Sequence, residues 1–234
     1  SDFDTLPNNL TTTTFDVIVK AVNDVPFGDT IPPMTIFEEA STTINMTGLN
    51  AGPGENEPLQ LSATSSDTTL IGNPTIDYSV GESSGSLNFT ALPDQIGTAT
   101  ITVIIEDGGL DNDLTTPFDN EEFTHSFDVT VAPVNDVPSG NPILNVAVDE
   151  DQPTQTVNFD GITAGPNESQ NMQITAISGD PSLFAHPTVS YTDGPTGSLD
   201  FTPLPDQYGT TTIAVTIEDG GLDNDLTTPF DNEE

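Results

Sequence analysis

The feature that most restricts how this chain can fold is a long internal repeat. The segment Ile105–Glu122 recurs without change as Ile217–Glu234, which sets an offset of 112 residues. At the same offset Val22–Pro26 recurs as Val134–Pro138. A period of this length is too long for a solenoid unit and matches the size of one whole domain. The sequence therefore predicts tandem copies of a single domain.

Each repeat contains short runs in which apolar and polar residues alternate, and Gly, Pro, Asn and Asp separate the runs. A period of two predicts half-buried strands, and no helical periodicity is visible. About seven strands per repeat favour an all-β sandwich of two antiparallel sheets. The clearest runs are Met34–Phe37, Leu59–Leu61, Ile76–Tyr78, Leu87–Phe89, Ile101–Ile104 and Phe127–Val131.

The repeat also predicts where the domains divide. Thr14–Pro26 aligns with Ser126–Pro138, the last strand and linker of a repeat. We therefore expect residues 1–26 to be the last strand and linker of a preceding or neighbouring-subunit domain, 27–138 a complete sandwich, and 139–234 a sandwich without its own last strand. Either the chain is a window of a longer array, or Thr12–Lys20 of the next molecule adds the missing strand. Both alternatives produce a filament.

The charge balance restricts the partners. The chain has 38 acidic residues and one basic residue, Lys20, for a net charge of -37. A basic face for nucleic acid or an anionic membrane is lacking, whereas divalent cations would relieve the repulsion. Such a composition is also typical of disorder, but the regular strand pattern argues against that. No apolar run is long enough for a membrane span and no signal segment is visible, so we expect any targeting signal to have been removed or to lie outside this fragment.

Four motifs resemble the cadherin-like repeats of giant bacterial surface proteins. In order they are Gly85–Leu87, Leu92–Asp94, Glu106–Gly108 and Val134–Pro138, and the resemblance covers both repeats. It implies tandem Ig-like or cadherin-like Greek-key sandwiches, outside the cell or on its surface, that bind calcium at domain junctions.

The resemblance also implies ligands. They come from the Asn-Asp of each linker, the acidic pair near the first strand, the late-strand aspartate and the mid-domain aspartate. For the first domain these are Asn23, Asp24, Glu38, Glu39, Asp107 and Asp94, and for the second Asn135, Asp136, Glu150, Asp151, Asp219 and Asp206. One departure is that Asp94 is followed by Gln95 and Ile96, where the family has a second acidic residue.

A second acidic cluster lies in the loop 111–122. Its oxygen-bearing side chains have the spacing of a twelve-residue calcium loop, but Thr116 replaces the turn glycine and no flanking helices are expected. We interpret it as a calcium-capable loop on a β-scaffold, with a chance match as the alternative. The candidates are Asp111, Asp113, Thr115, Asp119 and Glu122, with Asp223, Asp225 and Asp231 in the second repeat. The loops with Glu55 and Glu168 fit plain surface turns better than ligand loops.

Catalytic signals are weak. His125 and His186 occupy non-equivalent positions, Cys is absent, and no nucleophile motif occurs. A pair of glycosidase carboxylates is the remaining enzymatic alternative, without a specific signal. The sequence predicts no enzyme but a calcium-stabilised structural subunit of an extracellular fibre or stalk, whose partners are calcium and copies of itself head to tail. The alternative is an adhesin segment that binds a glycan or a protein. Sites such as Asn45 and Asn88 allow a glycan coating.

Overall fold

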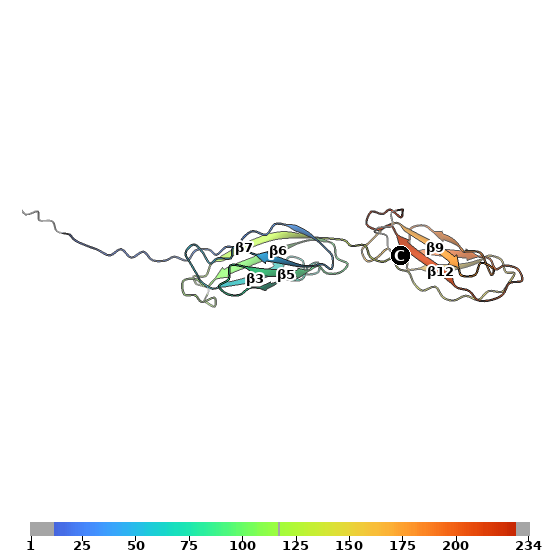
Figure 1. Ribbon diagram of the computed structural model, residues 1–234, viewed down its shortest axis with the longest axis horizontal. Helices are drawn as coiled ribbons and strands as arrows, with labels where there is room; N and C mark the ends of the chain where they lie inside the picture. Colours follow the sequence, from blue (N-terminus) through green and yellow to red (C-terminus); the bar gives the residue numbers. More distant parts are fainter. Residues whose placement is uncertain (1–11, 117, 228–234) are drawn as a thin grey trace, which may run out of the picture.

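The structure is a computed structural model that describes residues 12–116 and 118–227. Two elongated β-sandwiches follow one another along the chain, and the segment from residue 12 to the start of the first sandwich extends away from both (Figure 1). Within this described part, no helix has the length and apolar character needed to cross a bilayer.

The first sandwich contains seven strands in two sheets. One sheet has the order β1-β7-β6-β3 and the other β2-β5-β4, with β1 parallel to β7 and all other pairs antiparallel. This four-plus-three Greek-key order confirms the all-β fold class of Ig-like and cadherin-like domains. The bounds are β1 Met34–Phe37, β2 Ser41–Met46, β3 Leu59–Ser65, β4 Thr75–Asp77, β5 Gly85–Thr90, β6 Gly97–Asp107 and β7 Glu122–Ala132.

Six of these strands contain the alternating runs found in the sequence, and β2 does not. Its sequence STTINM has only two apolar residues, Ile44 and Met46, because Thr42 takes the first position on their face of the strand. The strand β2 is instead determined by its antiparallel pairing with β5 along the whole length of both strands.

The second sandwich repeats this arrangement only in part. One sheet has the order β10-β11-β8, and the other contains β12 paired with β9. In the described residues β9 is the only strand paired with β12, and residues 146–149, the counterpart of β1, form no strand. The bounds are β8 Gln155–Asp160, β9 Met172–Ser178, β10 Thr188–Tyr191, β11 Thr196–Phe201 and β12 Ile213–Asp219.

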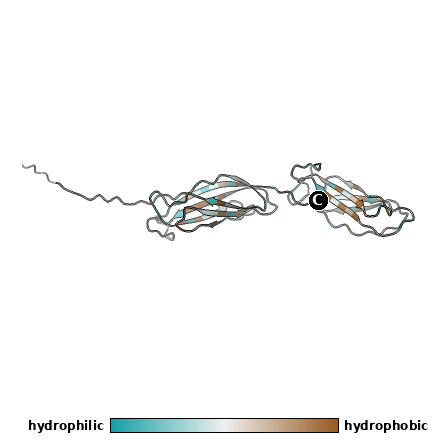
Figure 2. Cartoon of the chain, viewed as in Figure 1, coloured by the Kyte–Doolittle hydropathy of each residue, from teal (hydrophilic) through white to brown (hydrophobic). Residues whose placement is uncertain are grey.

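The core of each sandwich is made of apolar side chains that lie between its sheets. In the cartoon of Figure 2, hydrophobic and hydrophilic residues alternate in colour along the strands. Leu87 and Ile101 are fully buried in the first sandwich, and Leu199 occupies the place of Leu87 in the second. The outer faces are held by hydroxyl and carboxylate pairs. Thr100 Oγ1, for example, donates to Asp128 Oδ1 at 2.7 Å. In a chain with one basic residue, such pairs replace ion pairs.

Truncating one core leucine should destabilise only the sandwich that contains it. We expect Leu87→Ala and Leu199→Ala each to lower the free energy of unfolding of their own domain by about 2–5 kcal/mol, because each leaves a cavity in a closed core. Chemical denaturation followed by circular dichroism would measure this, with the exposed Val80→Ala as control. Equal effects of all three variants would contradict the assignment of two separate cores.

Candidate metal sites at the domain ends

The first candidate site lies where the linker from the N-terminal segment meets the first sandwich. Asp107, at the end of β6, is fully buried. Its Oδ1 accepts hydrogen bonds from the Asn23 side chain at 3.0 Å and from the backbone N–H groups of Gly109 and Glu121 at 2.9 and 3.1 Å. Asn23 also donates to the Asp119 carbonyl at 2.8 Å. A buried carboxylate thus attaches the linker to the end of the sheet.

The neighbouring loop 51–57 supplies a second carboxylate. Glu55 accepts from the backbone N–H of Asp24, at 3.3 Å to Oε1 and 3.2 Å to Oε2. The loop requires glycine at position 52, where φ is +150° and an added Cβ would lie 2.2 Å from Glu55 Oε2. The surface turn predicted here therefore belongs to the linker site.

Several buried oxygens at this end have no hydrogen-bond partner in the described structure. They are Asn23 Oδ1, Glu57 Oε2, Asp107 Oδ2 and Asn120 Oδ1. Buried oxygens without a donor are costly and rare in folded proteins. A cation would satisfy them, and a donor set made only of oxygen suits calcium. Among the described residues no three His, Cys, Asp or Glu side chains converge tightly enough to hold a metal alone, so amide and carbonyl oxygens must complete any such set.

The same arrangement recurs at the start of the second sandwich. Asn135 donates to Asp219 Oδ1 at 3.1 Å, and the Asp136 N–H donates to Glu168 Oε2 at 3.1 Å. Gln170, the counterpart of Glu57, donates to Asn135 Oδ1 at 2.9 Å. Buried oxygens without a partner in the described structure again include Asp136 Oδ2 and Glu168 Oε1. The linker of each sandwich thus makes the same pair of contacts with the sandwich that follows it.

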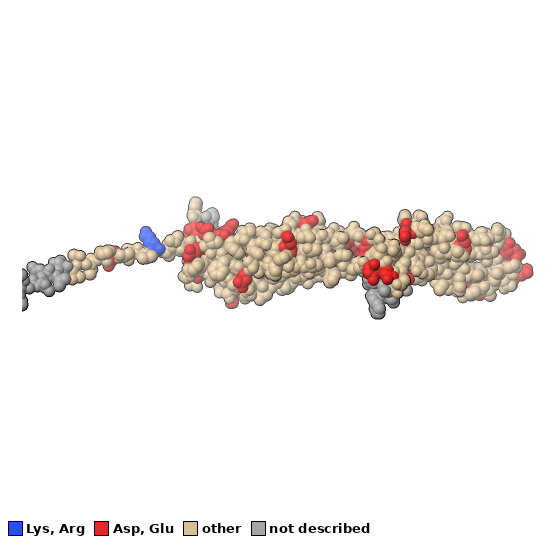
Figure 3. Space-filling model, turned by 90° about the horizontal axis from the view of Figure 1, so that it is seen from above, with Lys and Arg blue, Asp and Glu red and all other residues tan. Residues whose placement is uncertain are grey.

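The junction between the sandwiches brings carboxylates together from both sides. The pKa of Asp136 is raised by burial and by the negative charges of Asp94, Glu38 and Glu39. Glu38 is itself buried, and its Oε1 accepts from the Val134 N–H at 2.9 Å. Across the junction Asn167 Nδ2 donates to the Asp94 carbonyl. The acidic surface in this region is visible in Figure 3.

This geometry corrects the grouping implied by the family resemblance. Glu38 and Glu39 were expected beside Asn23 and Asp24, but the structure places them with Asp136 of the following linker. The reason is that β1 runs away from the Asn23 end and delivers its acidic pair to the opposite end of the sandwich. By the repeat, Glu150, Asp151 and Asp206 occupy the matching far end of the second sandwich, where all three are exposed.

Backbone strain marks these far ends. Glu39 and Asp94 have φ values of 61° and 56°, and their counterparts Asp151 and Asp206 have 61° and 56°. Non-glycine residues adopt this left-handed region at a cost, which is usually retained for a functional reason. Acidic residues in this left-handed conformation therefore stand at the far end of each sandwich.

The loop 111–122 does not gather its predicted ligands. Asp111 Oδ1 accepts from the Asp113 N–H, and Asp113 Oδ1 accepts from the N–H and hydroxyl of Thr115. The Thr115 hydroxyl lowers the pKa of Asp113. Glu122 begins β7 opposite Glu106. Asp225 makes the same turn with Thr227, the Asp225 N–H donates to Asp223, and Asp231 lies outside the described residues. A calcium site in this loop stays a prediction.

The two histidines have structural roles. His186 Nδ1 accepts from the Ser178 N–H at 3.1 Å, just as Asn73 Oδ1 accepts from the Ser65 N–H at 3.0 Å. His125 Nε2 lies 2.9 Å from the Ile31 N and 3.0 Å from its carbonyl. His186 therefore makes the same backbone hydrogen bond in the second repeat that Asn73 makes in the first.

Gly52→Ala should disrupt the linker site. The added methyl group would strike Glu55 and force a positive φ on alanine, so we expect a loss of about 1–3 kcal/mol in the stability of the first sandwich. Gly72→Ala is the matched control, because a Cβ there meets nothing within 4 Å. Unfolding in denaturant measures both, and equal stability of the two variants would refute the prediction.

The raised pKa of Glu168, caused first by burial, predicts a pH effect without metal. A carboxyl whose folded pKa exceeds its unfolded pKa binds protons more tightly when folded, so stability rises as pH falls through the folded pKa. Glu168→Gln mimics the protonated form. In chelator it should melt above the parent at neutral pH, and the gap should close on acidification. Melts over a pH series test this, with the exposed Glu82→Gln as control. A gap of constant size would contradict it.

Comparison with known proteins gives only distant likenesses. The sequence matches no protein-family model and no curated protein. Solved structures with a similar arrangement include mouse cadherin-23 EC22–24, which is 20% identical with a TM-score of 0.48 and matches 86% of this chain and 61% of its own length. They also include titin domains Z1Z2 in complex with telethonin, which are 11% identical with a TM-score of 0.35 and match 85% of this chain and 90% of their own length. Domains 5–6 of the S-layer protein SbsC are 16% identical with a TM-score of 0.29, and the match covers 82% of this chain and 91% of theirs. The likeness concerns the β-sandwich fold alone.

Proposed function

We propose that this chain is a calcium-stabilised structural module of an extracellular fibre or stalk, with no catalytic role. The observation that carries the proposal is the repeated cluster of buried oxygens at the start of each sandwich. Asp107 is fully buried against Asn23, and the donors that reach it in the described structure are neutral N–H groups. A divalent cation supplies the missing charge.

The residues present fit this metal at two kinds of place. At the start of the first sandwich, calcium would be held by oxygens of Asp107, Asn23, Asn120 and Glu57. At the junction it would be held by Asp136 and Glu168 together with Glu38, Glu39 and Asp94 from the preceding sandwich. Calcium prefers about six to eight oxygen ligands, and carboxylates, side-chain amides and carbonyls all serve.

Metal at the junction would determine the mechanical behaviour of the chain. Without it, Asp136 and the preceding Glu38, Glu39 and Asp94 repel one another and favour bending of the linker. With it, the same groups would attract the linker to both sandwiches and align them. Length and stiffness are then the function of the module, and copies stacked head to tail give a rod.

The same chemistry supports the proposed extracellular location. A net charge of -37 requires abundant counter-cations. Calcium sites in extracellular modules operate at dissociation constants of about 0.1–1 mM, where the ion is plentiful. The chain also has no cysteine, so metal would take the stabilising part that disulfides have in many secreted domains.

A calcium titration of stability tests the proposal. With calcium at a hundredfold excess over its dissociation constant, each site should stabilise its sandwich by about 2.7 kcal/mol. Melts in millimolar calcium and in chelator would show a large shift. The shift should shrink in Asp107→Asn and persist in Asp128→Asn, whose carboxylate lies on the exposed sheet face. Identical melts in calcium and chelator would refute it.

One observation favours the second candidate, an adhesin segment. Phe118, in the loop before β7, is 98% exposed. A large aromatic side chain on a loop is typical of a contact for a glycan or protein. Phe118→Ala should leave the calcium effect unchanged, whereas it would abolish binding if this loop holds a ligand. A screen against glycans and surface proteins measures that binding.

A further inference from the structure

The sites at the start of the two sandwiches share almost every residue. The linker is identical in both repeats, and so is the segment that contains the buried aspartate. Only the loop before strand β3 or β9 differs, and it has the sequence AGPGENE in Ala51–Glu57 and AGPNESQ in Ala164–Gln170. One exchange in this loop changes a charge, because Glu57 of the first repeat is Gln170 in the second. Within these three segments the charge of the two sites therefore differs at a single position.

The strand register places this position beside the buried aspartate of each site. Leu59 pairs with Asp107 in the first sandwich, and Met172 pairs with Asp219 in the second. The position that differs lies two residues before each of these pairs, where the loop enters its strand. The side chain there is partly buried in both sandwiches. A charge at this position is therefore held close to the end of β6 or β12 and is partly withdrawn from solvent.

In the second sandwich the amide at this position satisfies the linker with a hydrogen bond. Gln170 Nε2 donates to Asn135 Oδ1 at 2.9 Å, and Asn135 Nδ2 donates in turn to Asp219 Oδ1 at 3.1 Å. Burial raises the pKa of Glu168, and a hydrogen bond from Gln170 opposes that rise because it stabilises the carboxylate. The amide of Gln170 thus supplies, from the protein itself, donors that these oxygens would otherwise obtain from a cation.

The first sandwich has no such donor at this position, because an ionised glutamate only accepts hydrogen bonds. Asn23 Oδ1, the counterpart of the Asn135 oxygen, is buried without a partner in the described structure, and so is Glu57 Oε2. Asp107 has no exposed surface, and its Oδ2 is also unpaired there. Unpaired buried oxygens are costly, and the charges of two neighbouring carboxylates add repulsion. A divalent cation removes both costs.

We propose that the residue at position 57 or 170 sets how strongly each sandwich depends on calcium. Glu57 gives the first sandwich a tight site that its linker requires, whereas Gln170 holds the second linker by a hydrogen bond and leaves a weaker site. The inference rests on the proposed function and deepens it by naming the residue that determines affinity. Calcium affinity follows the charge of the ligands, so one carboxylate should change the dissociation constant on the order of tenfold.

The two sandwiches would then respond to different ranges of calcium concentration. As the ion is withdrawn, the weaker site of the second sandwich empties first, but its linker keeps the hydrogen bond from Gln170. The first sandwich retains its ion to lower concentrations. When that ion leaves, Asn23 Oδ1 and Glu57 Oε2 have no replacement donor in the described structure, so the linker loses its support there.

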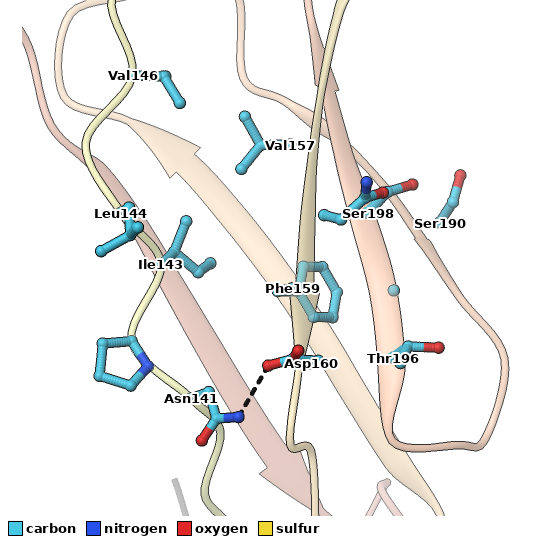
Figure 4. Close-up of a pocket in the computed structure, with 13 residues that line it drawn as sticks. Asn141, Ile143, Leu144, Val146, Val157, Phe159, Asp160, Ser190, Thr196 and Ser198 are labelled. Atoms are coloured by element: carbon cyan, nitrogen blue, oxygen red, sulfur yellow. Dashed lines mark hydrogen bonds between the residues drawn. The ribbon is translucent and has the colours of Figure 1, made fainter.

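A second exchange between the repeats shows why burial matters. Asp29 of the first repeat is Asn141 in the second, and both are exposed. Asp29 Oδ2 accepts from Thr47 Oγ1 at 2.7 Å, and Asn141 Nδ2 donates to Asp160 Oδ1 at 2.8 Å, as drawn in Figure 4. Both pairs are satisfied by a hydrogen bond and by solvent, so neither requires a cation. Asp29→Asn therefore removes a charge from the first sandwich without altering a buried site.

Hydrogen exchange of the full chain over a calcium series tests the proposal for each sandwich separately. Peptides from β3 and β9 report protection of the first and second sandwich, and protection rises as calcium binds. Glu57→Gln should raise the calcium midpoint for β3 on the order of tenfold and leave that for β9 unchanged. Gln170→Glu should lower the midpoint for β9 by a similar factor and leave that for β3 unchanged.

The controls for this experiment make the same changes of charge at exposed positions. Asp29→Asn is matched to Glu57→Gln, and Gln207→Glu, at the far end of the second sandwich, is matched to Gln170→Glu. Both controls should keep the midpoints of the parent. Equal midpoints in the parent and in the variants at positions 57 and 170 would overturn the proposal, and so would equal shifts in the variants and their controls.

Melts in chelator give a second readout that needs no metal. Glu57→Gln removes a partly buried charge and supplies an N–H for Asn23 Oδ1, so the first sandwich should melt above the parent. Gln170→Glu removes the donor to Asn135 Oδ1, so the second sandwich should melt below it. Added calcium should then stabilise Glu57→Gln less than the parent and Gln170→Glu more. A gain from calcium of the same size in all three proteins would contradict the proposal.

These measurements separate the inference from the proposed function. If calcium does not bind, exchange and melts will be the same in calcium and in chelator for the parent and every variant, which overturns both. If calcium binds but this position does not set its affinity, the parent will show the calcium shift, and Glu57→Gln will show it at the same midpoint. Only the inference then fails.

Discussion

Thirty-eight carboxyl groups and a single ammonium group cannot neutralise one another, and the rest of this structure depends on that imbalance. Exposed carboxylates on the sheet faces are tolerated because water and hydroxyl groups solvate them, as with Asp128 and Thr100. Asp107, in contrast, is withdrawn from solvent at the end of β6, where only neutral N–H donors reach it. The fold also brings the carboxylates of Asp94, Glu38 and Glu39 close to Asp136 at the junction, beside the linker.

The strand β7 takes part both in the apolar core of the first sandwich and in the linker to the second. It closes the apolar core of the first sandwich by burying Phe127 and Val129, and it then continues directly into the linker with Asn135 and Asp136. Core closure and junction chemistry are thus carried by one continuous segment. The N-terminal segment Thr14–Pro26 has the same sequence pattern, and its side chains Phe15, Val17 and Val19 are exposed in the described structure.

Much of the fold could be predicted because alternation of apolar and polar residues is a local property. The runs in β1 and β7 were visible from the sequence, whereas β2 was not, since threonine follows neither pattern clearly. In the site, the Asn-Asp linkers and Asp107 stood out through repetition. Glu57 and Asn120 did not, because nothing in the sequence shows that those side chains are buried. The carboxylate of Glu55 looked like part of a surface turn until its hydrogen bond to Asp24 was placed.

The sequence by itself determined the repeat, the all-β class, the lack of internal counter-charge and the duplication of the last strand. These follow from composition, period and identity between segments, which need no coordinates. Only the tertiary structure decided that Glu38 and Glu39 lie near Asp136 and not near Asn23, because the direction of β1 across the sandwich sets which end receives them. It alone showed the register in which β12 pairs with β9, because strand pairing joins residues far apart in the chain.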